Sequence, residues 1–328
     1  MRKVLLSVIL ITAIGAFAQD SKRKETKTTT TTAAPATTKG KAKKNKAKRP
    51  PVKTVCAKGG MFSLAATQGG SRNWAPGGDR YAMSTNAFLN LWATAQKGKC
   101  HFSTNLDVNY GLMYTEKFGA IKNDDKFELT SKWSHEFGKK VNKWDSSKAF
   151  RYGVTMNFRT QLTDGYDYDG EERKRISDFF APAILVLSPG VDYAGIKDLN
   201  IHFSPVAGRW VLVPNRPYEL GANYGVTPNH EVKNEFGSYL SLSYKHEILK
   251  NVFYRGRFDV FADYVDKTPG NMDLYWTNMF YLKVNRYLGV VYNFDLQYDD
   301  NTRIFGYFKN KPATQLKSIL GIGLNVKF

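Results

Sequence analysis

The chain has 328 residues, a formal net charge of +19 at pH 7 and an aromatic content of 14%. Beyond the N-terminal segment its longest apolar run is Ala181–Leu187. This excludes a protein that crosses a membrane with helices, because a spanning helix needs about 20 apolar residues. Many aromatic residues in a chain with a mean hydropathy of only −0.44 are typical of a β-barrel, in which polar lumen residues dilute the lipid-facing ones.

Residues 1–18 predict a signal peptide. Arg2 and Lys3 form a positive start, Val4–Ala18 is apolar, and Ala16-Phe17-Ala18 is a small-x-small cleavage site. The alternative, a transmembrane anchor, is disfavoured because the apolar stretch is too short to cross a bilayer. No cysteine follows the cleavage site, which argues against a lipoprotein.

Residues 19–53 predict a disordered, basic periplasmic arm. It contains a threonine run at Thr28–Thr32 and a lysine-rich stretch at Lys39–Arg49, with few apolar residues to offset the entropy of ordering. A solvated spacer is one interpretation. The other is that Lys39–Lys53 tethers the protein to peptidoglycan or another anionic periplasmic partner. Export argues against nucleic acid as the partner, although lysine runs often bind it.

Residues 54–328 predict one domain, an all-β, transmembrane, antiparallel up-and-down β-barrel of about 12 strands. Apolar and polar residues alternate over unusually long segments, for example along 102–114 and 288–298. Soluble sheets rarely contain strands of this length. The predicted strands are 58–69, 81–96, 100–115, 125–137, 148–162, 179–193, 198–213, 235–248, 251–266, 272–284, 286–299 and 314–328.

An even number of strands places both termini on one side, which must be the periplasm. The turns at Lys97–Lys99, Leu249–Asn251 and Asn285–Arg286 are then periplasmic and short. The external loops are longer, as is usual for outer-membrane barrels. They are Gly69–Arg80, Thr163–Asp178, Pro214–Asn234 and Tyr298–Ala313.

The last predicted strand resembles the closing strand of a bacterial outer-membrane barrel. Leu316, Ser318, Leu320, Ile322, Leu324, Val326 and Phe328 share one face, and a terminal aromatic residue is part of the signal read by the insertion machinery. We therefore expect an assembly signal at Gly323, Val326 and Phe328. The expected partners are the barrel assembly machinery, outer-membrane lipids and lipopolysaccharide in a Gram-negative bacterium.

Two cysteines follow the signal peptide, which permits one disulfide without requiring it. Cys56 precedes the first strand and Cys100 opens the third, both at the periplasmic end. Cα atoms must approach within about 7 Å for a disulfide, so Cys56 must bend beneath the second strand. We predict this bridge, with two free thiols as the alternative.

Charged residues of both signs occupy the predicted lumen face. They can pair and plug the barrel, or line a wet pore and set its selectivity. Twelve strands lie between the filled eight-stranded and open sixteen-stranded barrels, so both interpretations stay open. The predicted lumen residues are Asp107, Glu128, Lys132, Arg151, Arg159, Arg255, Arg257, Asp259, Asp263, Asp273, Lys283, Asp295 and Lys317.

His202 and Ser204 lie two residues apart on one strand face, and this resembles the His-x-Ser of outer-membrane phospholipase A, also a twelve-stranded barrel. A nucleophile and a base within reach are the minimum for acyl transfer. Pro205 follows the serine and the Ser-Asn-Gly context of that enzyme is missing. A membrane-embedded lipid hydrolase is thus the alternative function, and a purely structural pair is the main interpretation.

The segment 164–170 is acidic and glycine-punctuated. Asp164, Asp167 and Asp169 are oxygen ligands of the kind that Ca²⁺ prefers, but the terminal bidentate glutamate is not at the required spacing. A solvated loop is the simpler interpretation. We expect no cofactor.

Several segments resemble an uncharacterised Bacteroidota family, domain of unknown function 3078. The resemblance covers roughly 58–300 and implies an outer-membrane location, but no activity. The Thr/Lys-rich arm lies outside it. The segments are Asn73-Trp74-Ala75-Pro76-Gly77-Gly78, residues 124–132, Asn157-Phe158-Arg159-Thr160-Gln161, Gly165-Tyr166-Asp167-Tyr168, Phe179-Phe180-Ala181-Pro182-Ala183, Phe203-Ser204-Pro205 and residues 250–271. The sequence thus predicts a structural or interaction barrel in the outer membrane, and leaves open whether a narrow solute pore runs through it.

Overall fold

A computed structural model describes residues 54–70, 81–115, 118–137, 150–169, 172–214, 224–227, 230–265, 272–302 and 311–328. The predictions for the signal peptide and the basic arm lie outside these residues. The described residues contain no helix that is long and apolar enough to cross a membrane.

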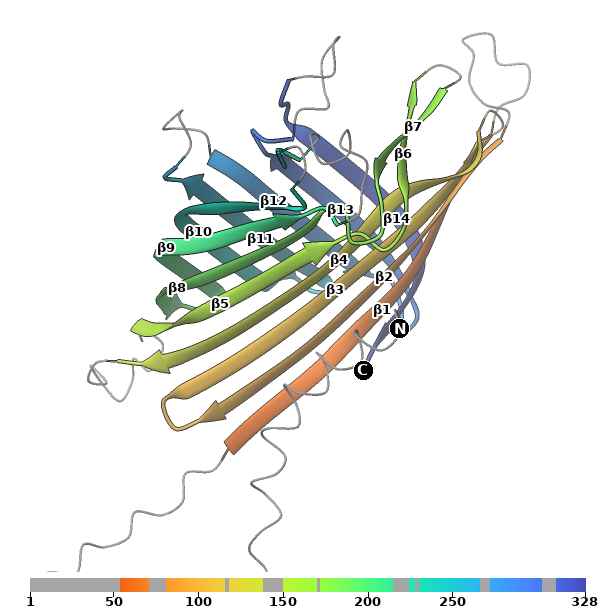
Figure 1. Cartoon of the computed structure of the whole chain (residues 1–328). Helices are drawn as coiled ribbons and strands as arrows, with labels where there is room; N and C mark the ends of the chain where they lie inside the picture. Colours follow the sequence, from red (N-terminus) through yellow and green to blue (C-terminus); the bar gives the residue numbers. More distant parts are fainter. Residues whose placement is uncertain are drawn as a thin grey trace, which may run out of the picture. The chain divides into compact units, whose positions relative to one another are not determined.

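Twelve long antiparallel strands close into one barrel, as the sequence predicted (Figure 1). The strands are β1 (Thr54–Gly70), β2 (Tyr81–Lys97), β3 (Cys100–Thr115), β4 (Gly119–Glu136), β5 (Phe150–Thr160), β8 (Ala183–Ile196), β9 (Leu199–Leu212), β10 (Val232–Leu249), β11 (Val252–Asp263), β12 (Met272–Lys283), β13 (Leu288–Tyr298) and β14 (Gln315–Lys327). The sequence did not predict the small hairpin of β6 (Gly165–Asp169) and β7 (Glu172–Ser177), which pair only with each other.

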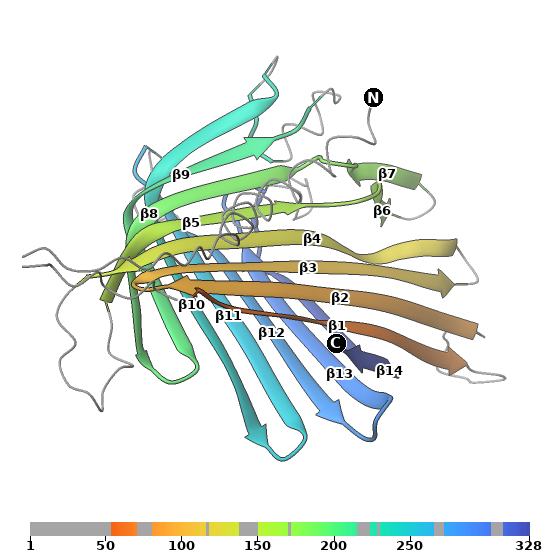
Figure 2. The same ribbon diagram turned by 90° about the horizontal axis from the view of Figure 1, so that it is seen from below.

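Each strand pairs with its neighbours in the chain, except where the β6–β7 hairpin separates β5 from β8. Short connections join β2 to β3, β8 to β9 and β10 to β11 at one end of the barrel, visible as tight turns in Figure 2. We call this the short-turn end and the opposite one the long-loop end. The β6–β7 hairpin lies at the long-loop end, between the last residue of β5 and the first of β8.

The burial pattern of the barrel is the reverse of that of a soluble protein. Among the described residues, polar and charged side chains outnumber apolar ones in the buried class. Many of the large apolar side chains are exposed instead, including Leu316, Leu320, Ile322 and Leu324 on β14, which are 56–62% exposed. Successive strand residues point to opposite faces, so the apolar set lies on the outside and the polar set fills the interior.

A bulge makes the inward face of β9 difficult to read from sequence. Tyr239 of β10 pairs with Ser204, whereas Gly237 pairs with Ala207, so Pro205 and Val206 lie opposite the single residue Ser238 and β9 carries one extra residue. His202 and Ser204 are buried before the bulge, and Ala207 and Arg209 are buried after it. The inward positions therefore change from even to odd numbers, as expected where one strand carries one additional residue.

The predicted disulfide is wrong, because Cys56 and Cys100 are free. Cys56 does not bend beneath β2 but continues β1, pairing with Ala95. Cys100 pairs with Lys97, whose partner on β1 is Thr54. The two cysteines are thus separated by a whole strand, about 10 Å, and are also offset along the strands, well beyond the span of a disulfide.

Candidate functional site

Ion pairs reach across the full width of the barrel interior. Arg255 of β11 binds Asp107 of β3 through two bonds of 3.0 and 2.7 Å. These strands lie six positions apart in either direction around the ring of twelve, so they stand on opposite walls. Asn90 and Asn105 donate to the same carboxylate at 2.6 and 2.9 Å. Opposite walls therefore meet at this level of the lumen.

A second cluster lies beside this bridge. Arg159 of β5 donates to Glu128 of β4 at 3.0 Å and also contacts Asp259 of β11. Arg257 donates to Asp259 at 3.0 Å and lies 3.4 Å from Glu128. Its guanidinium also donates to Tyr239 at 3.1 Å. Two arginines and two carboxylates thus neutralise one another within the lumen.

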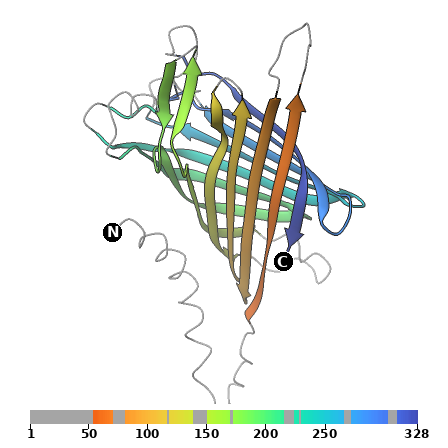
Figure 3. The ribbon, with the colours of Figure 1, turned by 90° about the vertical axis from the view of Figure 1, so that its right-hand side faces the viewer.

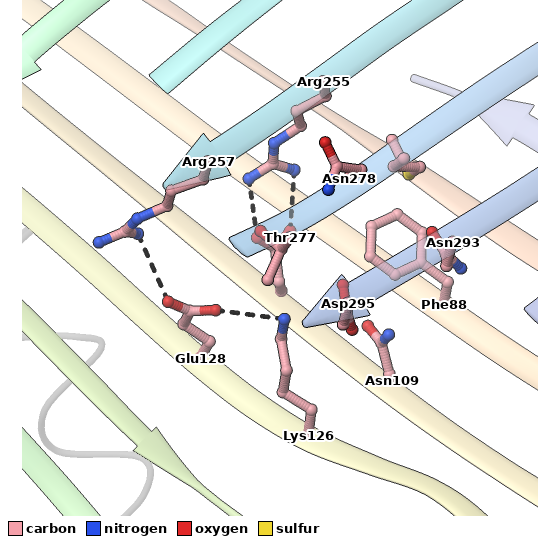
Figure 4. Close-up of a pocket in the computed structure, with 12 residues that line it drawn as sticks. Phe88, Asn109, Lys126, Glu128, Arg255, Arg257, Thr277, Asn278, Asn293 and Asp295 are labelled. Atoms are coloured by element: carbon pink, nitrogen blue, oxygen red, sulfur yellow. Dashed lines mark hydrogen bonds and ion pairs between the residues drawn. The ribbon is translucent and has the colours of Figure 1, made fainter. Parts of the chain in front are cut away.

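Together these six residues form what we call the lumen belt: Asp107, Glu128, Arg159, Arg255, Arg257 and Asp259. Figure 4 shows Arg257 pointing at Glu128, which Lys126 approaches from its other side at 3.4 Å. Arg159 also packs over the ring of Tyr275 at 4.2 Å. Beside the belt remains a space of about 50 Å³, enough for only a few waters.

A larger cavity, of about 460 Å³, lies between the belt and the long-loop end. Its wall includes the last residue of β5, the first of β14 and, on the belt side, Glu128 and Arg159. We call it the outer cavity. Its volume lies in the range of small-molecule sites, about 300–1,000 Å³.

Arg209 holds a separate cluster near the rim of this cavity. Its guanidinium lies 3.2 Å from Glu235 and 2.7 Å from Asp299, and it also contacts Asp273. Arg209 is only 3% exposed, so one buried cation serves three carboxylates. Lys233 adds a second positive charge at 2.7 Å from Glu235.

The structure places most of the predicted lumen residues in this interior. Lys317 lies 2.9 Å from Asp124 and 3.0 Å from Asp295, and Lys132 lies 2.8 Å from Asp192. Three predicted residues lie near the rims instead. They are Asp263 at the end of β11, Lys283 at the end of β12, and Arg151, which approaches Glu136 at 3.9 Å.

Several charged residues of the interior were not predicted from the sequence, among them Asp124, Asp192, Arg209, Glu235 and Asp299. Arg209 follows the bulge in β9, where the alternation changes phase. Asp192 follows Pro189, and a proline within a strand interrupts the pattern from which inward positions are predicted. Asp299 lies just beyond β13, where the alternation of the strand no longer predicts which side chains point inward. For Arg209, the one available signal in the sequence was the shift of the apolar–polar alternation at Pro205.

The predicted pairing of His202 with Ser204 is also wrong. Ser204 donates to the carbonyl oxygens of Pro189 and Val206, at 2.6 and 2.8 Å. His202 instead contacts Ser188 through Nε2 at 3.0 Å and Asp192 through Nδ1 at 2.7 Å. Such an order of groups resembles a catalytic triad, but Ser188 is 0% exposed and lines none of the cavities described above. The trio therefore acts as a buried polar link between β8 and β9.

The acidic segment 164–169 does not form a described metal site. Asp164 pairs with Arg175 of β7 at 3.0 Å, and the side chains of Asp167 and Asp169 lie outside the described part. Among the described residues no group of three or more His, Cys, Asp or Glu could hold a metal ion.

At the base of the hairpin, Asp125 accepts bonds from the backbone N–H groups of Leu162 and Thr163 at 2.8 and 2.9 Å. Tyr224 donates to the carbonyl oxygen of Ile176 at 2.9 Å, and burial raises the pKa of its phenol. Tyr224 therefore stays protonated as a donor. These bonds fix the hairpin to the rim of the outer cavity.

Comparison with protein families gives one match. Residues 66–166 match the family described as "Protein of unknown function (DUF3078)". The chain carries a DUF3078 segment. This confirms the predicted resemblance over β2, β3, β4 and β5, which supply Asp107, Glu128 and Arg159 to the lumen belt. The other half of the belt, on β11, lies beyond the DUF3078 match.

No curated protein matches the chain. Among solved structures, it is similar to the translocator domain of autotransporter NalP from Neisseria meningitidis, at 10% identity and a TM-score of 0.30. That similarity covers 86% of this chain and 90% of the other. A TM-score this low does not establish a common fold, and the function of this barrel is inferred from its own side chains.

Proposed function

We propose that the chain is an integral outer-membrane β-barrel that serves as a structural or interaction barrel, with a lumen closed by the belt rather than an open diffusion pore. The observation that carries this proposal is the Arg255–Asp107 bridge between opposite walls. Side chains that meet across the barrel narrow the lumen at that level, and the space beside them is only about 50 Å³.

The outer surface supports the membrane location. A soluble protein rarely exposes large contiguous apolar patches, and here apolar side chains cover the outer faces of most strands. A closed barrel satisfies its backbone hydrogen bonds internally, which is the condition for crossing a bilayer with strands.

Aromatic rings lie on the outer surface of the barrel, near both of its ends. Near the short-turn end, Trp133 lies 6.4 Å from Tyr152 and Phe150 lies 5.0 Å from Tyr193. Near the long-loop end, Phe158 lies 5.4 Å from Phe180. Two such bands are typical of the aromatic girdles that mark the two membrane interfaces.

The conductance of the purified protein tests the closed lumen. In a planar bilayer at neutral pH, we expect no single-channel steps above the baseline of a protein-free bilayer. The heat-dependent mobility of the protein on gels must first confirm that it is correctly folded. Steady open-channel currents from the unmodified protein would contradict the proposal and favour a solute pore.

Surface labelling tests the orientation, which we propose to have periplasmic termini and external long loops. Cysteines are introduced separately at Asp169 and Gly98, in a chain with Cys56→Ser and Cys100→Ser. A membrane-impermeant maleimide should label the cysteine at position 169 in intact cells, and that at position 98 only after the outer membrane is opened. The opposite pattern would invert the topology.

Phe328 is proposed to be needed for assembly, because it helps join the two strands that close the barrel. Its backbone exchanges hydrogen bonds of 3.0 and 2.7 Å with Gly60, and its ring packs where a side chain at Gly60 would lie. A chain ending at Lys327 should give several-fold less folded protein than the full chain, as measured by heat-dependent mobility on gels. Phe328→Tyr, which keeps ring and backbone, is the matched control. Equal folded levels of the shortened and full chains would remove Phe328 from the assembly signal.

A further inference from the structure

The seam that closes the barrel is incomplete toward the long-loop end. β1 pairs with β14 from Met61 and Lys327 only as far as Ala66 and Ile322. β13, on the other side of β14, continues its pairing to Gln315. Within the described residues, the stretch Gln315–Gly321 therefore has one strand edge without a strand partner. Figure 3 shows β1, in orange, beside β14, in dark blue, at this seam.

Along this edge, the side chains of β14 that point out of the barrel are apolar. Leu316 is 62% exposed and Leu320 is 59% exposed, as expected for residues in contact with lipid. Each unsatisfied backbone group in hydrocarbon costs several kcal/mol, so a free edge at this depth requires polar groups from the lumen side.

The outer cavity borders the first residues of β14. Gln315, Leu316 and Lys317 are consecutive residues and all line it, so the backbone of β14 forms part of the cavity wall. Gln297 of the neighbouring strand also lines it and donates to the Gln315 side-chain oxygen at 3.1 Å. The Gln315 side-chain nitrogen, which is buried, is left without an acceptor.

The charges that line the cavity are already neutralised. Lys122 binds Asp125, Lys126 lies against Glu128, and Lys317 binds Asp124 and Asp295. The acceptor Asn123 Oδ1 is buried without a donor. The uncharged polar groups on its wall are amides, hydroxyls and phenol rings: Asn123, Gln315, Thr160, Thr302, Tyr224 and Tyr275. The hydroxyls of Thr160 and Tyr224 already donate to backbone carbonyl oxygens and can only accept a further hydrogen bond.

We propose that the outer cavity binds the sugar head of a neutral glycosylated amphiphile, whose alkyl chain leaves through the open β1–β14 seam into the outer leaflet. Amides of both hydrogen-bonding senses match sugar hydroxyls, and phenol rings pack against sugar C–H faces. The alkyl chain would lie against Leu316 and Leu320. This inference rests on the proposed membrane location, since the seam must open into lipid.

The test uses tritiated octyl glucoside, below its micellar concentration, and the full chain in nanodiscs of zwitterionic phospholipid. We expect saturable binding near one molecule per barrel. Glucose, which lacks the chain, and octyl phosphocholine, which has the same chain and a charged head, should each bind at least tenfold more weakly. Gln315→Leu should weaken octyl glucoside binding at least tenfold, whereas Gln96→Leu, at the short-turn end, should leave it unchanged.

A disulfide across the seam tests the exit route. Gln68→Cys and Leu320→Cys, in a chain with Cys56→Ser and Cys100→Ser, extend the register of the Ala66–Ile322 pair by two residues on each strand. Oxidation should reduce octyl glucoside binding at least tenfold, and a reducing agent should restore it.

Equal binding of octyl phosphocholine, equal binding in the Gln315→Leu variant, or unchanged binding after oxidation would each overturn the inference. A barrel that is closed in the conductance assay and binds no octyl glucoside would contradict the inference alone. A conducting barrel that still binds octyl glucoside would contradict only the closed lumen.

Discussion

Replacing Arg209 with leucine is expected to lower the free energy of unfolding by about 3–5 kcal/mol, because it leaves three carboxylates without the buried cation that pairs with them. Glu235, Asp273 and Asp299 would then face one another with only Lys233 for compensation. The measurement is urea unfolding of the barrel in lipid vesicles, followed by tryptophan fluorescence. Arg209→Lys should recover part of the loss, since a lysine keeps the charge but cannot contact all three carboxylates with a planar fork.

Arg175→Leu is the matched control for this experiment. Arg175 also bridges two carboxylates, of Asp164 and Asp178, but its side chain is 39% exposed in the β6–β7 hairpin. Water screens such a pair, so the expected loss is about 0–1 kcal/mol. Similar decreases in the free energy of unfolding for Arg209→Leu and Arg175→Leu would show that burial of the Arg209 cluster adds nothing to stability.

Removing the cross-lumen part of the belt is expected to turn a closed barrel into a channel. The variant combines Asp107→Ala, Arg255→Ala, Glu128→Ala and Arg257→Ala, which removes two charges of each sign. Arg159 keeps its partner Asp259, and Lys126, which loses its partner Glu128, is 25% exposed and can be solvated. The small space beside the belt would then widen into the outer cavity, with which it already shares Lys126 and Glu128. Single-channel recording should show discrete openings, with mean current at least tenfold above that of the unmodified protein.

The control for the opened barrel is Asp164→Ala with Arg175→Ala, an ion pair of the same type outside the lumen. It should stay as silent as the unmodified protein. If the fourfold belt variant folds and remains silent, the belt is not what closes the lumen, and another constriction must be sought. Lys245, which lies 5.8 Å from the ring of Trp92 on the opposite wall, would be the next candidate.

The fold follows almost entirely from the period of the sequence. Side chains alternate along an extended strand, so a wall with lipid on one side and water on the other imposes a period of two on the chain. This local rule is enough to locate all twelve strands to within a few residues and to place Asp107, Glu128, Arg159, Arg255 and Asp259 on the inner face. It fails at the β6–β7 hairpin, which is short, polar and removed from the lipid that imposes the pattern.

Partners across the lumen do not follow from this rule. Asp107 and Arg255 are separated by half of the barrel's circumference, and which residues face each other depends on the number of strands and on their stagger. The phase change at Pro205 hid Arg209, because a bulge alters the count on one strand without altering composition. The same long-range geometry separated Cys56 from Cys100, since β1 continues straight where a bend was predicted.

The sequence by itself thus determined the strand number and the inner and outer faces, because each depends on residues close together in the chain. The tertiary structure alone decided that ion pairs join opposite walls of the lumen, that His202 contacts Ser188 rather than Ser204, and that the β1–β14 pairing stops at Ala66 and Ile322. These features depend on how the ring closes, and ring closure is a property of all twelve strands together.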